Sequence, residues 1–185
     1  MIKPLLKTLT DKFVNWCYDN FVYDEVVEVD TGKLIMSRFY PFPTFFQGKV
    51  LINVIYGEYD LFHTHISSFF SIILYGGYSE RIWHGGENYT ERSVNFWNKK
   101  NHDDVHLTDL YEEKCISLLF FGPFKTRQFR YLVDGKLIWG LRYWKQKGFS
   151  KEDVEIRPKL PRKRKLPKRV EDAVNAFQVK LDMEK

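Results

Sequence analysis

Short runs rich in Val, Ile, Phe and Tyr make up the chain from Glu25 to Phe149, and Gly, Pro, Asn and Asp separate them. Runs spaced by about eight to twelve residues are typical of β-sandwiches and β-barrels. They predict about eleven strands, among them "YDLFHTH" at 59–65 and "KLIWGLRYW" at 136–144. The Asp-Gly pair in "YLVDGKLIW" predicts a tight type I′ hairpin. Because so many strands would leave exposed edges in one open sheet, we expect an all-β fold that closes on itself or stacks as two sheets.

Composition agrees with a single β-rich domain. Aromatic residues make up 17% of the 185 residues, which favours sheet surfaces over helical bundles. Cys17 and Cys115 have neither disulfide-framework nor metal-ligand spacing, so we expect a reducing, cytoplasmic location. No apolar run approaches the roughly 18 residues that a membrane span requires, so we expect a soluble protein without a membrane partner.

Helical patterns flank the β-rich part. Residues 1–22 predict an amphipathic helix and 23–149 the β domain. Prolines and basic residues in 150–169 predict an extended linker, and 170–185 predict a C-terminal helix. Since the extended basic stretch carries few apolar side chains, we expect the β domain to stay folded when residues 157–185 are deleted.

The net positive charge of the chain comes from "RPKLPRKRKLPKR" at 157–169, which contains eight Lys or Arg and no acid. Such a segment attracts polyanions, so it predicts contact with nucleic acid or an acidic protein. The alternatives are a solubilising linker and a segment that docks on acidic parts of its own or another subunit. No aromatic residue alternates with the charges, which argues against a dedicated single-strand binder. The candidate polyanion-binding residues are Arg162, Lys163, Arg164, Lys165, Lys168 and Arg169.

Two histidines stand close together in "LFHTHISSFF". On a strand, His63 and His65 point to the same face, so both imidazoles can reach one metal ion. The alternatives are buried histidines bonded to neighbouring groups and surface histidines without a role. Further along, Glu80 and Arg81 follow a glycine turn, and we expect them to form a solvated strand end.

The spacing around the two histidines resembles the first signature of the cupin superfamily. Five residues separate Gly57 from His63, three separate His65 from Phe69, and six separate Phe69 from Gly76. Phe69 stands where the family has Glu. The resemblance covers roughly residues 23–149 and implies a double-stranded β-helix, or jelly roll. The chain looks most similar to small single-domain cupin-like proteins found in bacteriophage genomes.

The resemblance also implies a third metal-ligating histidine from a later strand. His106 begins the alternating run "VHLTDL", as the third histidine of the family does, whereas His102 lies in a polar, turn-like cluster. A divalent transition metal held by His63, His65 and His106 is therefore expected, with His84 and His102 outside the site. Three histidines without a carboxylate resemble the iron site of cupin thiol dioxygenases, which favours Fe over Zn, Mn or Ni.

Two functions follow from this interpretation. The first is an iron-dependent, dioxygenase-like oxidoreductase that acts on a small molecule in the barrel. In the second, Phe69 fills the barrel, and the histidines are remnants in a non-catalytic binding module or a phage accessory protein that uses its basic tail. A homodimer is also expected, because cupin barrels often pair through their sheets.

Overall fold

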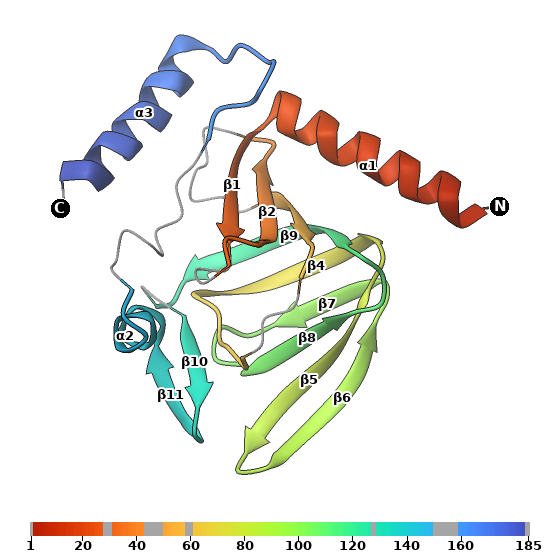
Figure 1. Cartoon of the computed structure of the whole chain (residues 1–185), viewed down its shortest axis with the longest axis vertical. Coiled ribbons are helices and arrows are strands. Elements are labelled where there is room, and N and C mark those ends of the chain that lie inside the picture. The colour runs from red at the N-terminus through yellow and green to blue at the C-terminus, as the bar shows by residue number, and fades with distance from the viewer. Residues whose placement is uncertain are drawn as a thin grey trace.

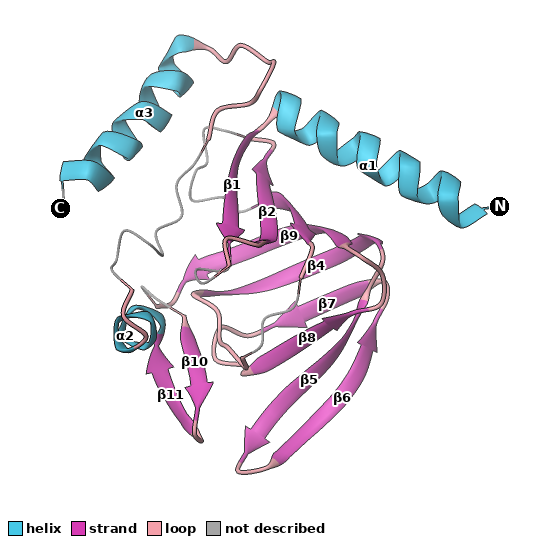
Figure 2. Cartoon of the chain, in the orientation of Figure 1, coloured by secondary structure: helices cyan, strands magenta, loops and turns pink. Residues whose placement is uncertain are grey.

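The computed structural model of the chain consists mainly of antiparallel strands in two sheets, with helices at its periphery (Figure 1, Figure 2). It describes residues 2–27, 31–42, 50–57, 61–126, 129–149 and 159–183, with only the backbone of 2–3 and 177–183. The first sheet has the spatial order β1 (Val22–Val27), β2 (Leu34–Tyr40), β3 (Val50–Ile55), β9 (Cys115–Phe124), β4 (Ser67–Tyr75) and β7 (Trp97–Lys100).

The second sheet has the order β6 (Asn88–Val94), β5 (Tyr78–Gly85) and β8 (His106–Leu110). Bridges from His63 to His106 and to Tyr131 continue it through the segment 61–65 to β10 (Arg130–Val133) and β11 (Lys136–Trp139). The helices of the described part are α1 (Ile2–Asn20), α2 (Gly140–Gln146) and α3 (Lys168–Met183). None of these helices combines the length and the apolar character needed to cross a membrane.

The strand order identifies the fold as a jelly roll. From β3 to β9 there are eight extended segments when 61–65 is counted as the second. In spatial order, the first sheet contains β3, β9, β4 and β7, which are the first, eighth, third and sixth of these segments. The second sheet contains 61–65, β8, β5 and β6, which are the second, seventh, fourth and fifth. This arrangement of two antiparallel sheets is the double-stranded β-helix of jelly rolls, to which cupins belong. The predicted all-β fold with a helix before it and a helix after it is confirmed.

The first sheet is buried on both faces near its centre. On β3, Leu51 packs on one face with Phe69 and Leu119. The next residues of the other parity, Ile52 and Val54, pack on the opposite face against the C-terminal part of α1. Burial of each such side chain stabilises the fold by about 1.5–3 kcal/mol relative to exposure. Because apolar side chains of β3 point alternately to the two faces, one face contributes to the core between the sheets and the other contacts α1.

Two of the predicted strands differ in the structure. Of 59–65, residues 59–60 lie outside the described part, and 61–65 is an extended segment bridged only through His63. The predicted strand 136–144 ends at Trp139 and continues as α2, because Tyr143 and Trp144 pack together on Tyr131. Tertiary packing thus overrides the alternating pattern. The type I′ hairpin is confirmed, with φ angles of 49° at Asp134 and 73° at Gly135.

The C-terminal segment contributes to the core, which contradicts the reason given for expecting that its deletion leaves the β domain folded. Leu166, Val170 and Val174 are all buried, and they pack in one cluster with Val22 and Tyr40. Figure 1 shows α3 and α1 at the same end of the molecule, beside β1 and β2. The prediction considered only the many charges of the basic stretch, whereas its Leu166, just before the start of α3, is buried in the core.

Candidate metal centre

His63 and His65 lie on the extended segment that joins the two parts of the second sheet. The backbone of His63 exchanges two hydrogen bonds with that of His106 on β8, at N···O distances of 2.9 and 3.0 Å. On the β10 side, the N–H of Thr64 donates to the carbonyl of Arg130 at 2.9 Å. The side chain of Thr64 accepts a hydrogen bond from the N–H of Arg130, and alternation directs the two flanking imidazoles the other way.

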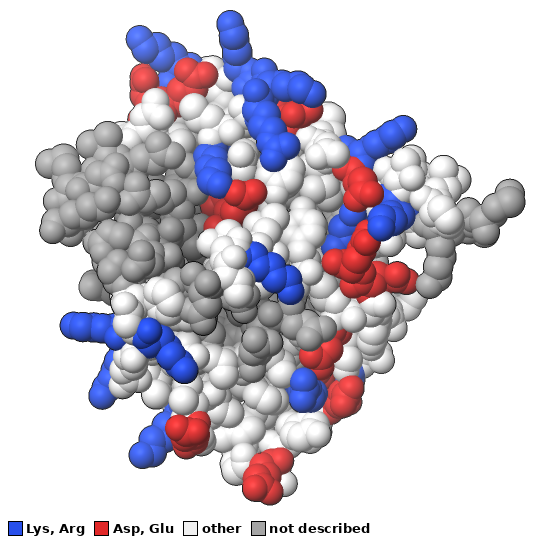
Figure 3. All heavy atoms as spheres, viewed as in Figure 1, with Lys and Arg blue, Asp and Glu red and all other residues white. Residues whose placement is uncertain are grey.

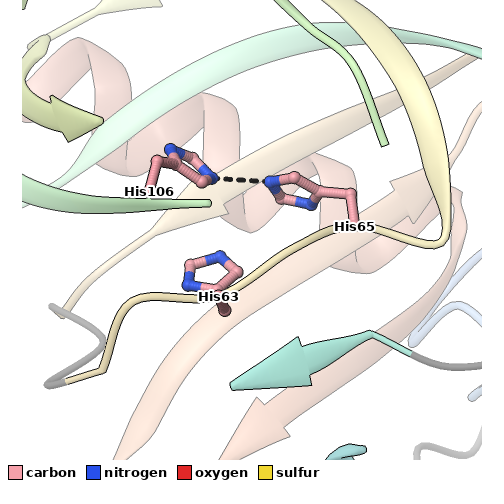
Figure 4. Close-up of side chains that lie close together, drawn as sticks. All are labelled: His63, His65 and His106. Atoms are coloured by element: carbon pink, nitrogen blue, oxygen red, sulfur yellow. Dashed lines mark hydrogen bonds between the residues drawn. The ribbon is translucent and has the colours of Figure 1, made fainter. Parts of the chain in front are cut away.

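The three histidines singled out by the sequence come together (Figure 4). One ring nitrogen from each of His63, His65 and His106 lies within 4.8 Å of the other two. Ring centroids are 4.8 Å apart for His63–His106 and His65–His106, and 5.2 Å apart for His63–His65. His63 and His106 are buried and His65 is half-buried. Nitrogens that bind one metal ion at about 2.1 Å lie within about 4.2 Å of one another, so only a small adjustment would place all three on one ion.

His84 and His102 lie outside this cluster, as expected. His84 is exposed, and its Nε2 forms a hydrogen bond with Thr90 Oγ1 at 2.9 Å. The backbone of His102 accepts a hydrogen bond from the N–H of His65 at 3.1 Å and donates one to Ser68 Oγ at 3.1 Å. His102 therefore positions the His65 backbone, while its own ring does not join the cluster.

The surroundings favour the neutral form of all three clustered imidazoles, because each pKa lies below its ordinary value. Burial is the main cause: it lowers the pKa of His63 to about 3 and the pKa of His65 well below the usual value. Proximity to His106 lowers both pKa values further. Burial also lowers the pKa of His106, although a hydrogen bond to Glu80 opposes this effect. Neutral imidazoles carry a lone pair, which is the form that binds metals.

Hydrogen bonds determine which nitrogen of two of the rings carries the lone pair. His106 Nδ1 lies 2.6 Å from Glu80 Oε1, and an ionised carboxylate only accepts, so Nδ1 donates and Nε2 holds the lone pair. His63 Nδ1 lies 3.2 Å from the carbonyl of Leu61, which gives the same tautomer. The Nε2 atoms of His65 and His106 are 2.6 Å apart, and two facing lone pairs repel. Either His65 carries its proton on Nε2 and donates it to His106, or a cation lies between the two lone pairs. The second arrangement is the one that fits a metal ion.

Glu80 anchors a buried ionic network behind His106. Its carboxylate is fully buried and accepts hydrogen bonds from Lys100 at 2.9 Å and from Arg92 at 2.7–2.8 Å. Asn98 joins the network by donating to Glu80 Oε1 at 3.3 Å. Burial alone would raise the pKa of Glu80, but the hydrogen bond from His106 and the nearby ammonium of Lys100 lower it to about 2. The carboxylate is therefore ionised and holds the orientation of the His106 ring.

The prediction that Glu80 belongs to a solvated strand end is wrong. Glu80 and Ile82 share a face of β5, and the register pairs Glu80 with Thr108 and Ile82 with His106. Glu80 and His106 are consequently diagonal neighbours on one face of the sheet. Strand parity alone would have placed Glu80 with the buried Tyr78. Its pairing with β8 is a long-range contact that no local pattern reveals.

Phe69 occupies the position where the resemblance would place a carboxylate. It lies on β4, is buried, and packs its ring at a right angle to that of His65 with centroids 4.8 Å apart. Gly76 ends the same strand with φ of 76°, and a Cβ there would lie 2.4 Å from the carbonyl of Lys114. The turn after β4 therefore requires glycine, in agreement with the spacing of the sequence signature.

The six basic residues predicted to bind polyanions lie elsewhere. They belong to the segment before α3 and to the first turn of α3, at the end of the molecule near α1 and away from the β5–β8 part (Figure 1). All of them are exposed: Arg162, Lys163, Arg164, Lys165, Lys168 and Arg169.

Comparisons with known proteins add no activity to this picture. No protein-family model matches the sequence, and neither does any curated protein. Hydroxypropylphosphonic acid epoxidase from S. wedmorenis is 12% identical over 40% of this chain and 42% of its own, with a TM-score of 0.33. The DMSP lyase DddQ from Ruegeria pomeroyi is 16% identical over 58% and 50%, with a TM-score of 0.34. Drosophila melanogaster CENP-C, in a structure bound to CAL1, is 6% identical over 63% and 98%, with a TM-score of 0.44.

The matched part thus covers half or less of the epoxidase and of the lyase. Because these similarities are low, the assignment of the fold rests on the strand order of the chain itself.

Proposed function

We propose that the chain binds a divalent transition metal ion through His63, His65 and His106. The observation that carries this proposal is the convergence of three neutral ring nitrogens within 4.8 Å. The ionised carboxylate of Glu80 supports it, because it directs the Nε2 lone pair of His106 toward the other two rings. Outer carboxylates of this kind orient metal-ligating histidines and raise their basicity.

The donor set bears on the identity of the metal. Among the described residues, no Asp, Glu or Cys side chain joins the three histidines. Glu80 contacts His106 at Nδ1, on the side of the ring opposite the shared Nε2 contact. A neutral set of three imidazoles suits Fe, Zn or Ni and leaves coordination positions open. We favour iron, because the resemblance to three-histidine cupin sites favours it, with Zn, Mn and Ni as alternatives.

We further propose that the iron-bound protein is an oxidoreductase of the dioxygenase type that acts on a small molecule in the barrel. Bound iron would supply redox chemistry at the positions that the three histidines leave open. Residues of the chain orient the ligands and cover the site: Glu80 orients the ring of His106, and the apolar ring of Phe69 packs against His65. Phe69 cannot supply a fourth ligand, so one face of the site stays apolar.

A specific contact favours a second candidate, a binding module without catalysis. The 2.6 Å contact between His65 and His106 is complete with a single shared proton. Packing of Phe69 against His65 also fills space inside the barrel. In this alternative the histidines form a buried hydrogen-bonded core, and the barrel or its C-terminal segment engages a ligand or partner.

Elemental analysis of protein produced without an affinity tag tests the proposal. Cells are grown with ample Fe, Mn, Ni and Zn, and we expect about one metal ion per folded chain. The variant His63→Ala/His65→Ala should lose this metal and stay folded by circular dichroism. The matched control His84→Ala/His102→Ala also removes two imidazoles, and it should keep the metal. Wild-type protein with far less than one ion per chain would contradict metal binding and support the non-catalytic module.

A further inference from the structure

The basic segment 159–169 is ordered by contacts with the folded body. Its backbone pairs with β1, where the N–H of Tyr23 donates to the carbonyl of Lys159 at 3.0 Å. Further along, the N–H of Arg164 donates to the carbonyl of Asp19 at 2.8 Å. The buried side chain of Leu166 completes the attachment. Because the backbone is held at these points, the exposed side chains of this segment have defined positions on the surface.

The seven basic side chains of the segment fall into two groups. The inner group is used within the molecule, against α1 and β1. Its members make the following contacts: Lys159 pairs with Glu25, the guanidinium of Arg162 lies 4.1 Å from the ring centroid of Tyr18, and Lys163 pairs with Asp19 at 2.6 Å. The charges of this group are therefore already partnered.

The outer group consists of Arg164, Lys165, Lys168 and Arg169. All four are exposed, and none forms an ion pair with an acid in the part of the chain that the structure describes. Figure 3 shows Lys and Arg side chains projecting at the end of the molecule where α3 begins, with acidic side chains next to some of them. These four cations are thus available to an external anion.

The position of the outer group concentrates positive potential. Lys168 and Arg169 lie in the first turn of α3, where the helix dipole is already positive and disfavours cations. Glu171 is the acid of that turn. An anion that bound there would relieve the repulsion between these cations and the dipole.

The side chains around the outer group distinguish between a protein and a nucleic acid as its partner. Within 164–169, the one large apolar side chain is Leu166, and it is buried. Protein interfaces usually have an apolar centre, whereas binding to a phosphate backbone needs only cations. We propose that Arg164, Lys165, Lys168 and Arg169 form a docking surface for the phosphate backbone of double-stranded nucleic acid, without base specificity. This surface is separate from the histidine cluster and does not depend on a metal.

The test measures binding of the full-length chain to a random-sequence DNA duplex by fluorescence anisotropy, at several salt concentrations. The variant Lys165→Gln/Lys168→Gln/Arg169→Gln should bind about tenfold or more weakly at low salt. Its slope of log K against log salt should be smaller by about 2.7, since each phosphate contact contributes about 0.9. The control Lys33→Gln/Lys99→Gln/Lys136→Gln removes the same charge from exposed sites elsewhere and should match the wild type.

Three results would overturn the proposal. The first is a wild-type chain that does not bind the duplex even at low salt. The second is a control variant that loses as much affinity as the outer-group variant, which would mean that net charge alone governs binding. In the third, poly-glutamate displaces the duplex as effectively as unlabelled duplex at equal charge, which would assign the surface to acidic proteins.

Discussion

Two lysine–carboxylate pairs of this molecule have similar geometry and opposite surroundings. Lys100 and Glu80 are 2.9 Å apart, with side chains 1% and 0% exposed. Lys163 and Asp19 are closer, at 2.6 Å, but their side chains are 78% and 22% exposed. Water screens the second pair and solvates each partner when the contact opens. The shorter contact is therefore expected to be the one that matters less for stability.

The buried pair differs from the exposed one because water cannot solvate either charge if the other is removed. Lys100 would be left in a low-dielectric interior if Glu80 lost its charge, and burial already lowers the pKa of Lys100. The same carboxylate orients His106, so stability and the geometry of the histidine cluster depend on one group. In the C-terminal segment, by contrast, attachment depends on buried apolar side chains, and the charges of the outer group, Arg164, Lys165, Lys168 and Arg169, have no acidic partner among the described residues.

The largest effect is expected for Glu80→Gln. This change removes the charge that compensates Lys100 and leaves a buried cation without an ionised partner. Loss of one member of a buried ion pair typically costs 3–5 kcal/mol, so the free energy of unfolding should fall by about that amount in urea titrations. A loss below about 1 kcal/mol would show that the buried and exposed pairs do not differ.

The next effect concerns the core contribution of the C-terminal segment. Leu166→Ala leaves a cavity in the cluster around Val22 and Tyr40, and should lower the free energy of unfolding by about 2–3 kcal/mol. Lys165→Gln, at the neighbouring exposed position, should change it by less than about 0.5 kcal/mol. Equal effects of the two changes would contradict attachment by burial.

A pH titration sharpens the same contrast. The pKa of Glu80 falls from about 4.5 in the unfolded chain to about 2 in the folded one, so its contribution is present above pH 4.5 and is lost as the pH falls toward 2. The difference in unfolding free energy between wild type and Glu80→Gln should therefore shrink by about 1.4 kcal/mol per pH unit in this window. Urea titrations between pH 5 and pH 3 measure it. A constant difference would mean that the pKa of Glu80 is the same in the folded and unfolded chain.

The smallest effect is expected for Asp19→Asn. This change removes the charge paired with Lys163 but keeps the backbone carbonyl that holds Arg164. Exposed pairs contribute at most about 1 kcal/mol, so unfolding in urea should shift by less than that. The effect should also vanish at high salt, where exposed charges are screened. A larger shift that persists at high salt would place this pair with the buried one.

Local patterns in the sequence account for much of the fold. The spaced apolar runs predict a closed β fold, and the Asp-Gly pair predicts the β10–β11 hairpin. For the site, parity along one segment suffices to place His63 and His65 on the same face. These predictions succeed because they depend on backbone geometry within a few residues.

Long-range pairing decides the rest. The resemblance to a known signature pointed to His106, but only the register of β5 with β8 places Glu80 behind its ring. The composition of the C-terminal segment suggested a loose tail, while the structure buries Leu166 and α3 against β1 and β2. The predicted strand 136–144 likewise ends at Trp139, because the residues after it form α2 and pack on Tyr131.

The sequence by itself therefore determined the β-rich class, the closing turns and the pair of same-face histidines, since periodicity and turn chemistry are local properties. Only the tertiary structure decided which charges are buried and which stay in water. Glu80 and Asp19 cannot be told apart as carboxylates in the sequence, and only the fold buries one and leaves the other partly in water. We therefore expect desolvation to make Glu80 matter more for stability. Burial depends on which distant segments cover a side chain, and that is known only once the chain has folded.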